Sequence, residues 1–291
     1  MKNLLLATTA ALVLAVTAGC GRSEAPVARL KVEPNALRLP YPELAALKFT
    51  WEPISAVPTI PTVFVHLVDE KGEIERTFDH PYPAAFQPGS PQTYNVHIYQ
   101  TALATPLPAG KHRLVAGLYL PGGDRWTLEA GGEEFRKREY VVATIDVPPV
   151  DPQAPKLAFT RTWLAAEGGG DRQTLIRRWL TGNGALRLAP IKKTGAFFLS
   201  FRIPQGDNPG EKLVTEGPNP PSVEIASSCG GVLTNISGPG SHLVQIPVDA
   251  LPADGQCVVR LHPNYHLEVT GSPFKRTVAL ENVAWAPKAA S

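Results

Sequence analysis

The chain has 291 residues, of which 19% are charged, and its formal net charge is only +2. Proteins that bind nucleic acid usually carry a strong basic excess, so nucleic acid is not an expected partner. The 30 prolines and 25 glycines separate short apolar segments, a distribution typical of turns that join short strands. An all-β fold is therefore predicted, and the length suffices for two domains.

The N-terminus predicts an export signal. Lys2 gives a positive start, an apolar run covers residues 4–16, and the small residues Ala18 and Gly19 precede Cys20. This order of charge, apolar run and small residues is that of a signal peptide. The apolar run is too short for a membrane-spanning helix, which needs about 20 apolar residues.

The same segment resembles the signal of a bacterial lipoprotein. Ala18 and Gly19 match the lipobox, whereas Thr17 stands where Leu or Val is usual. The resemblance implies that residues 1–19 are removed and that lipid, including palmitate, is attached to Cys20. This lipid would anchor the chain stably, because two or three acyl chains hold a protein on a membrane. Ordinary cleavage that leaves Cys20 unmodified is the alternative.

Residues 20–27 are predicted to form a short lipidated tether. Gly21 follows the cysteine, and the lack of an Asp at that place favours the outer membrane over the inner membrane. From residue 28 to 147 the chain alternates between apolar segments and turns, as a β-sandwich does. Its expected strands cover residues 47–51, 63–68, 73–78, 94–99, 112–120, 126–129 and 139–147.

A segment with four prolines follows at residues 148–155. It is expected to be an extended linker between domains, because proline lacks a backbone donor and fixes φ. A second β-sandwich is predicted at residues 156–287. Its expected strands cover residues 157–164, 185–188, 196–203, 222–227, 242–248, 256–262 and 276–285.

The cysteines beyond the tether form an even pair. Cys229 and Cys257 would lie in a compartment that oxidises thiols, so a disulfide between them is predicted. On the loop-entropy model this bridge would stabilise the fold by about 3–4 kcal/mol. Two buried free thiols are the alternative.

Short motifs in both halves resemble a known pair of domains. Residues 63–69, 79–81, 87–89 and 108–119 resemble an immunoglobulin-like accessory domain of bacterial envelope proteins and of the soluble tails of membrane glycosyltransferases. The second half is similar to the jelly-roll, galactose-binding-like domain that accompanies it there. The residues that carry this likeness are Trp163 with Glu167, Arg178 with Trp179, and residues 276–285. The resemblance implies two β-sandwiches with sugar contact, and it implies no transferase activity because the membrane-embedded catalytic part is missing.

Catalytic and metal motifs are absent from the sequence. It contains no Gly-x-Ser-x-Gly elbow, His-Glu-x-x-His, Cys-x-x-Cys or P-loop, so no catalytic residue, cofactor or metal site is predicted.

Two groups of histidines are candidates for metal or acid-base chemistry. His262 and His266 flank a turn and are expected to be surface histidines rather than zinc ligands. His66, Asp79 and His80 can meet across a hairpin, where a structural contact that satisfies half-buried polar groups is expected.

The last candidate site is a cluster of aromatic and charged residues in the second half. Glu167 and Arg178 are expected to pair beside Trp163 and Trp179. Such a group can act as a sugar platform, with an indole face stacked on a pyranose. The favoured interpretation is a structural latch, a salt bridge over core tryptophans.

These features together predict a non-enzymatic lipoprotein of the cell envelope. The membrane is its expected partner through lipid on Cys20, and a polysaccharide or another envelope protein is its expected ligand. A polysaccharide-processing hydrolase and a purely structural assembly partner are the alternatives.

Overall fold

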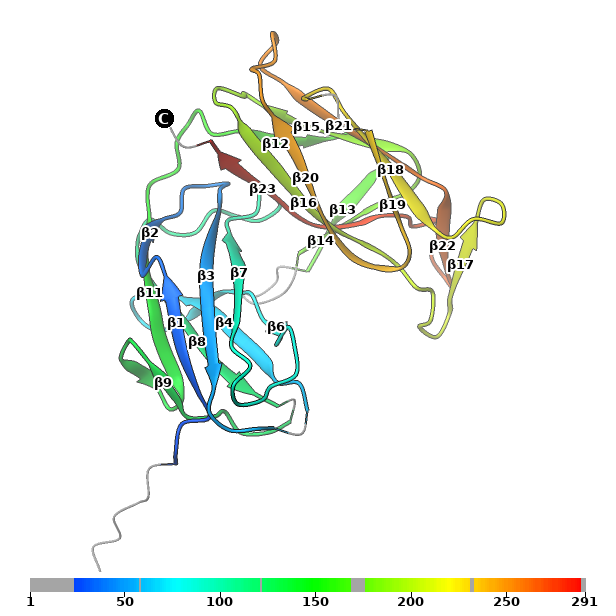
Figure 1. Cartoon of the computed structure of the whole chain (residues 1–291). Coiled ribbons are helices and arrows are strands. Elements are labelled where there is room, and N and C mark those ends of the chain that lie inside the picture. Colours follow the sequence, from blue (N-terminus) through cyan, green and yellow to red (C-terminus); the bar gives the residue numbers. More distant parts are fainter. Residues whose placement is uncertain (1–23, 58, 121, 169–175, 231–232, 289–291) are drawn as a thin grey trace, which may run out of the picture.

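Strands and turns make up the regular structure of the chain. The computed structural model describes residues 24–57, 59–120, 122–168, 176–230 and 233–288, and within these ranges it has 23 strands and no helix. The strands form two β-sandwiches that lie next to each other in Figure 1. The predicted all-β fold with two sandwich domains is confirmed.

The first sandwich has two sheets. One sheet contains, in order, β7 (Gln92–Tyr99), β3 (Leu44–Pro53), β1 (Ala28–Glu33) and β9 (Leu128–Ala130). The other contains β10 (Glu134–Arg136), β11 (Glu139–Val147), β8 (Gly110–Tyr119), β4 (Thr62–Val68) and β5 (Ile74–Thr77), with β2 (Ala36–Arg38) beside β11 and β6 (His80–Pro81) beside β4.

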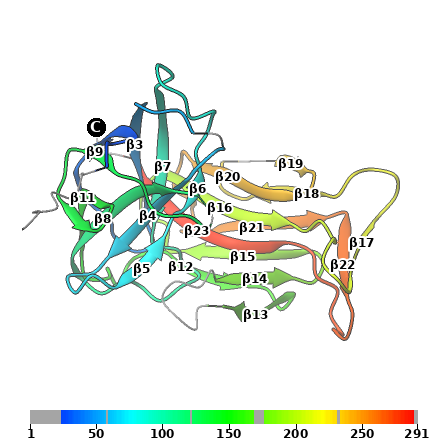
Figure 2. The same ribbon diagram turned by 90° about the horizontal axis from the view of Figure 1, so that it is seen from below.

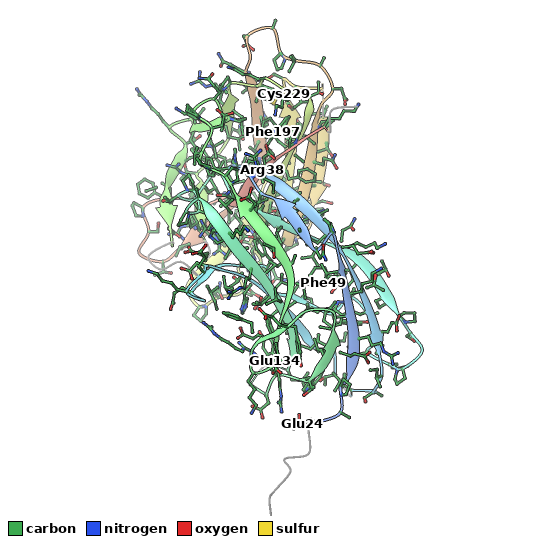
Figure 3. The ribbon with its side chains drawn as sticks, turned by 90° about the vertical axis from the view of Figure 1, so that its left-hand side faces the viewer. Glu24, Arg38, Phe49, Glu134, Phe197 and Cys229 are labelled. Atoms are coloured by element: carbon green, nitrogen blue, oxygen red, sulfur yellow. A yellow bond between two sulfur atoms is a disulfide. The ribbon has the colours of Figure 1, made fainter. Side chains whose placement is uncertain are left out.

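The strand order is immunoglobulin-like: β7, β3 and β1 are neighbours in one sheet, β5, β4, β8 and β11 are neighbours in the other, and β2 runs parallel to β11. Alternation along each strand explains the core: β3 buries Leu47, Phe49 and Trp51 on one face, and its other face is polar. Figure 3 marks Phe49 in this core.

The second sandwich also has two main sheets. One contains β12 (Lys156–Phe159), β15 (Gly184–Ala189), β21 (Cys257–Pro263), β18 (Ser222–Ser227) and β19 (Leu233–Ser237). The other contains β13 (Trp163–Glu167), β14 (Arg177–Leu180), β23 (Ala279–Pro287), β16 (Gly195–Ile203) and β20 (Gly240–Val248). A separate pair is formed by β17 (Glu211–Thr215) and β22 (Tyr265–Val269).

The connections of the second sandwich are those of a jelly roll. From β14 to β23 successive strands lie in opposite sheets, apart from the β18–β19 hairpin and the separate β17–β22 pair. The pairings within the two main sheets are antiparallel. Strand β16 buries Phe197, Leu199 and Phe201 in the core, as its alternation predicts. Phe197 is marked in Figure 3.

Two expectations about the chain path are wrong. Residues 157–164 do not form one strand, because a turn in which the Trp163 amide donates to the Thr160 carbonyl (3.2 Å) moves the chain from one sheet to the other. The linker at residues 148–155 is not extended throughout. It contains a turn in which the Ala154 amide donates to the Asp151 carbonyl (2.9 Å).

The two sandwiches are joined along the edge of β23. Strand β14 has only four residues and pairs with the start of β23, at Ala279 and Leu280. Further along β23, the Ala102 amide donates to the Val283 carbonyl (2.7 Å), and the Trp285 amide donates to the Pro42 carbonyl (2.8 Å). We call this backbone pairing the seam, and Figure 2 shows β23 running from the second sandwich to the first.

Side chains of the first sandwich complete the seam. The Thr101 hydroxyl, which is buried, accepts hydrogen bonds from the amides of Val283 (3.2 Å) and Leu103 (3.3 Å). Ala102 and Leu103 pack against the core of the second sandwich. Because backbone hydrogen bonds and apolar contacts occur together here, the seam fixes the two sandwiches as one unit.

We expect Thr101→Val to weaken this unit. Valine keeps the shape of threonine but cannot accept a hydrogen bond. The buried Val283 amide and the part-buried Leu103 amide therefore lose their acceptor, and the free energy of unfolding falls by about 1–3 kcal/mol. Urea unfolding measures the change. Thr93→Val is the matched control, because Thr93 is exposed on β7; equal effects of the two substitutions would contradict the role given to Thr101.

Candidate functional site

A cleft of about 1000 Å³ opens on the first sandwich, where its two sheets separate. Its walls come from β1, β3 and β9 on one side and from β11 on the other. The residues that line it are Arg29, Leu30, Lys31, Val32, Glu33, Pro34, Asn35, Thr50, Glu52, Glu129, Ala130, Gly131, Gly132, Val141, Val142, Ala143 and Thr144.

The chain path explains why the sheets part here. Strand β1 belongs to one sheet, whereas β2 pairs with β11 in the other, so the chain must cross between them at residues 34–35. The crossing is held by the Thr144 amide, which donates to the Asn35 carbonyl (2.9 Å). The strand β11 also shifts register between Val141 and Ala143. Bulges of this kind are common next to binding and active sites.

Alternating charges cover the polar wall of the cleft. Arg29 lies between Glu129, at 2.9 Å, and Glu52, at 3.6 Å. The hydrogen bond from Arg29 to Glu129 is the largest cause that raises the pKa of this guanidinium. One cation therefore serves two carboxylates.

The third carboxylate of the cleft, Glu33, has two lysine partners. Its distances are 2.8 Å to Lys31 and 3.4 Å to Lys48. The hydrogen bond from Lys31 is the largest cause that lowers the pKa of Glu33, followed by that from Lys48. This carboxylate stays ionised at neutral pH, so it accepts hydrogen bonds and does not supply a proton.

The predicted tryptophan cluster lies in the second sandwich, where both indoles are buried. Trp163 and Trp179 are each only 6% exposed. The Trp163 indole donates to the Ala185 carbonyl (3.0 Å), and the Trp179 indole donates to Glu167 (2.9 Å). A sugar platform requires an exposed ring face, so this geometry favours the structural latch.

The predicted ion pair between Glu167 and Arg178 is wrong. Among the described residues, Glu167 pairs with Arg276 at 3.0 Å, not with Arg178. The guanidinium of Arg178 donates to the Leu164 carbonyl (2.6 Å) and lies over the Phe159 ring at 4.1 Å. Burial lowers the pKa of Arg178.

Two arginines that the sequence analysis did not select complete the latch. Arg276 and Arg177 lie 5.1 and 5.7 Å from the centre of the Trp179 ring. Arg177 also pairs with Glu281 at 3.0 Å. Cations over an indole face stabilise it in place, so the latch contains Glu167, Trp179, Arg177 and Arg276.

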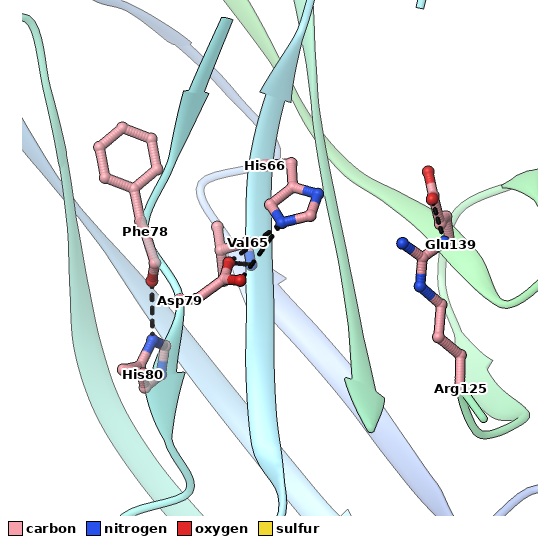
Figure 4. Close-up of polar contacts among 7 residues, drawn as sticks. All are labelled: Val65, His66, Phe78, Asp79, His80, Arg125 and Glu139. Atoms are coloured by element: carbon pink, nitrogen blue, oxygen red, sulfur yellow. Dashed lines mark hydrogen bonds and ion pairs between the residues drawn. The ribbon is translucent and has the colours of Figure 1, made fainter. Parts of the chain in front are cut away.

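The histidine group of the first sandwich is divided between two contacts (Figure 4). His66 pairs with Asp79 at 3.1 Å, and Asp79 also accepts from the Val65 amide (3.0 Å). His80 instead contacts the Phe78 carbonyl (3.0 Å) and the Tyr94 hydroxyl (2.9 Å). The contact between His66 Nε2 and Asp79 is the structural contact expected for this group, whereas the buried Nδ1 of His66 has no hydrogen-bond partner among the described residues.

The other histidine pair lies on strands and not in the expected surface loop. His262 is on β21 and His266 is on β22, where it contacts Glu268 at 3.3 Å. The described part of the chain has no group of three or more His, Cys, Asp or Glu side chains that could hold a metal ion.

The predicted disulfide between Cys229 and Cys257 is confirmed, with their Cα atoms 5.4 Å apart. Figure 3 shows Cys229 at the opposite end of the molecule from Glu24. Cys20 and the predicted signal peptide lie outside the described residues. Within the described residues, no helix is long and apolar enough to cross a membrane.

The charged wall of the cleft was missed because β1 was not predicted. Its alternation was nevertheless present in the sequence: Ala28, Leu30 and Val32 face the core, and the residues between them are charged.

No protein-family model and no curated protein matches this chain.

We expect Glu167→Ala to lower the free energy of unfolding by about 1 kcal/mol, because the Trp179 indole and Arg276 both lose a partner. Glu167→Gln should cost less, since the amide oxygen still accepts from the indole. Urea unfolding of both variants checks this. Glu216→Ala, at an exposed site in the same sandwich, should have no effect; an unchanged stability of Glu167→Ala would contradict the latch.

Proposed function

We propose that the chain is a non-enzymatic, lipid-anchored protein of the bacterial cell envelope that binds a polysaccharide or another envelope protein through its β-sandwiches. The observation that carries the proposal is the pairing of the acids in the cleft. Glu33, Glu52 and Glu129 are each ion-paired with Arg29, Lys31 or Lys48. Such a surface supplies donors and acceptors for hydroxyl groups.

The same pairing argues against a hydrolase. Glycoside hydrolysis usually needs two carboxyl groups, one of which keeps its proton because its pKa is raised. In the cleft the pKa of Glu33 is lowered by Lys31 and Lys48. Glu52 and Glu129 share Arg29 as an ion-pair partner. We therefore favour binding over bond cleavage.

The arrangement of the two sandwiches supports a role as a spacer on a membrane. Residues 24–27 leave the lower end of the first sandwich in Figure 1, and the second sandwich lies at the upper end. With lipid on Cys20, the seam would hold the second sandwich away from the membrane. The outer membrane is the proposed location. The immunoglobulin-like and jelly-roll order also fits the proposed likeness to accessory domains with sugar contact.

The lipid anchor is tested by metabolic labelling. Cells that express the full chain should incorporate labelled palmitate into it, and Cys20→Ser should abolish the label because it removes the thiol that accepts lipid. Membrane fractionation then locates the protein. Label that persists in Cys20→Ser would contradict the proposed anchor.

The ligand is tested with the full, lipidated chain in detergent on an array of bacterial glycans. Binding through the cleft predicts that Arg29→Ala weakens it about tenfold, since one charged hydrogen-bonding group contributes about 1.5–3 kcal/mol. Arg161→Ala, at an exposed turn, is the control. Unchanged binding by Arg29→Ala would exclude the cleft as the binding site. Absence of binding to every glycan on the array would favour a protein partner. Release of cleaved sugar would contradict the non-enzymatic role.

A further inference from the structure

The end of the first sandwich from which the tether leaves combines two uncharged segments with charged side chains, among them Glu24 and Arg138. The uncharged segments are residues 54–57 and 59–61, between β3 and β4, and residues 81–91, from the end of β6 to the residue before β7. Neither contains a charged residue, although charged residues make up 19% of the chain. We call these two segments the tether end.

The two segments are attached to each other and to the tether. The Val27 carbonyl accepts from the amides of Ile54 (2.8 Å) and Ser55 (3.1 Å). The Val57 amide donates to the Phe86 carbonyl (3.3 Å). The place where the tether leaves is therefore fixed against the segment 54–61.

Exposed apolar side chains gather at this end. Within the described part of the first sandwich, the large hydrophobic residues that are exposed are Ile54, at 39%, and Ile60, at 55%. Both lie in the same uncharged segment. Charged side chains lie beside these segments: Arg29 pairs with Glu52 at 3.6 Å, and Arg138 pairs with Glu24 of the tether at 2.6 Å.

We propose that the tether end rests on the bilayer that holds the lipid anchor, with Ile54 and Ile60 inserted at the level of the headgroups. This inference rests on the proposed lipid at Cys20. Residues 21–27 can span at most about 25 Å at 3.3–3.6 Å per residue, so the anchor keeps the tether end close to the membrane. Apolar side chains at such a surface are stabilised by burial among the headgroups and acyl chains.

Spin labels on the full, lipidated chain in vesicles of phosphatidylethanolamine and phosphatidylglycerol test this contact. One label is placed through Ala56→Cys, and the control label through Ala253→Cys, an exposed alanine in the loop between β20 and β21 at the top of Figure 1. Oxygen concentrates in the bilayer and a nickel chelate stays in water. The ratio of oxygen to nickel collisions should be about tenfold higher at position 56 than at position 253.

The exposed isoleucines are tested in the same vesicles. Ile54→Ser together with Ile60→Ser should lower the ratio at position 56 to that at position 253. Leu243→Ser with Leu251→Ser, which removes two exposed leucines from the second sandwich, should leave it unchanged.

A label at position 56 that reports water while the protein floats with the vesicles would overturn this inference and leave the anchor standing. A chain that does not float with the vesicles would contradict the anchor and the inference together.

Discussion

The edge of β23 is the constraint on which the arrangement of the molecule depends. Strand β14 is too short to cover it, and an uncovered edge of a buried strand leaves backbone donors and acceptors without partners. The first sandwich supplies those partners through Pro42, Thr101 and Ala102. The second sandwich therefore depends on the first to complete one of its own sheets.

This dependence gives the molecule two distinct ends. The tether and the uncharged segments lie at one end, and the disulfide between Cys229 and Cys257 lies at the other. The cleft lies along the first sandwich, between its two sheets. The sheets separate where the chain crosses from β1 in one sheet to β2 in the other. Because the seam combines backbone hydrogen bonds with the partly buried side chains of Ala102 and Leu103, it resists relative motion of the two halves better than a linker alone would.

Much of the fold could be predicted from local patterns. Alternation of apolar and polar residues identified β8, β16 and β18, and the even pair of cysteines identified the disulfide. Strand β1 has the same alternation but was missed, and the turn at Thr160 has no glycine or proline that would mark it. The pairing of Glu167 with Arg276 depends on the register of distant strands, which no local pattern contains. The seam was missed for the same reason.

Native-state hydrogen exchange of the full chain distinguishes a fixed seam from two sandwiches that separate. The amides of Ala102, Val283 and Trp285 form the seam. If the two sandwiches are one unit, these amides should exchange as slowly as that of Leu199 in the core strand β16, since all would open only in global unfolding. Fast exchange of the three amides while Leu199 stays protected would show that the sandwiches separate in the native state, and would contradict the account.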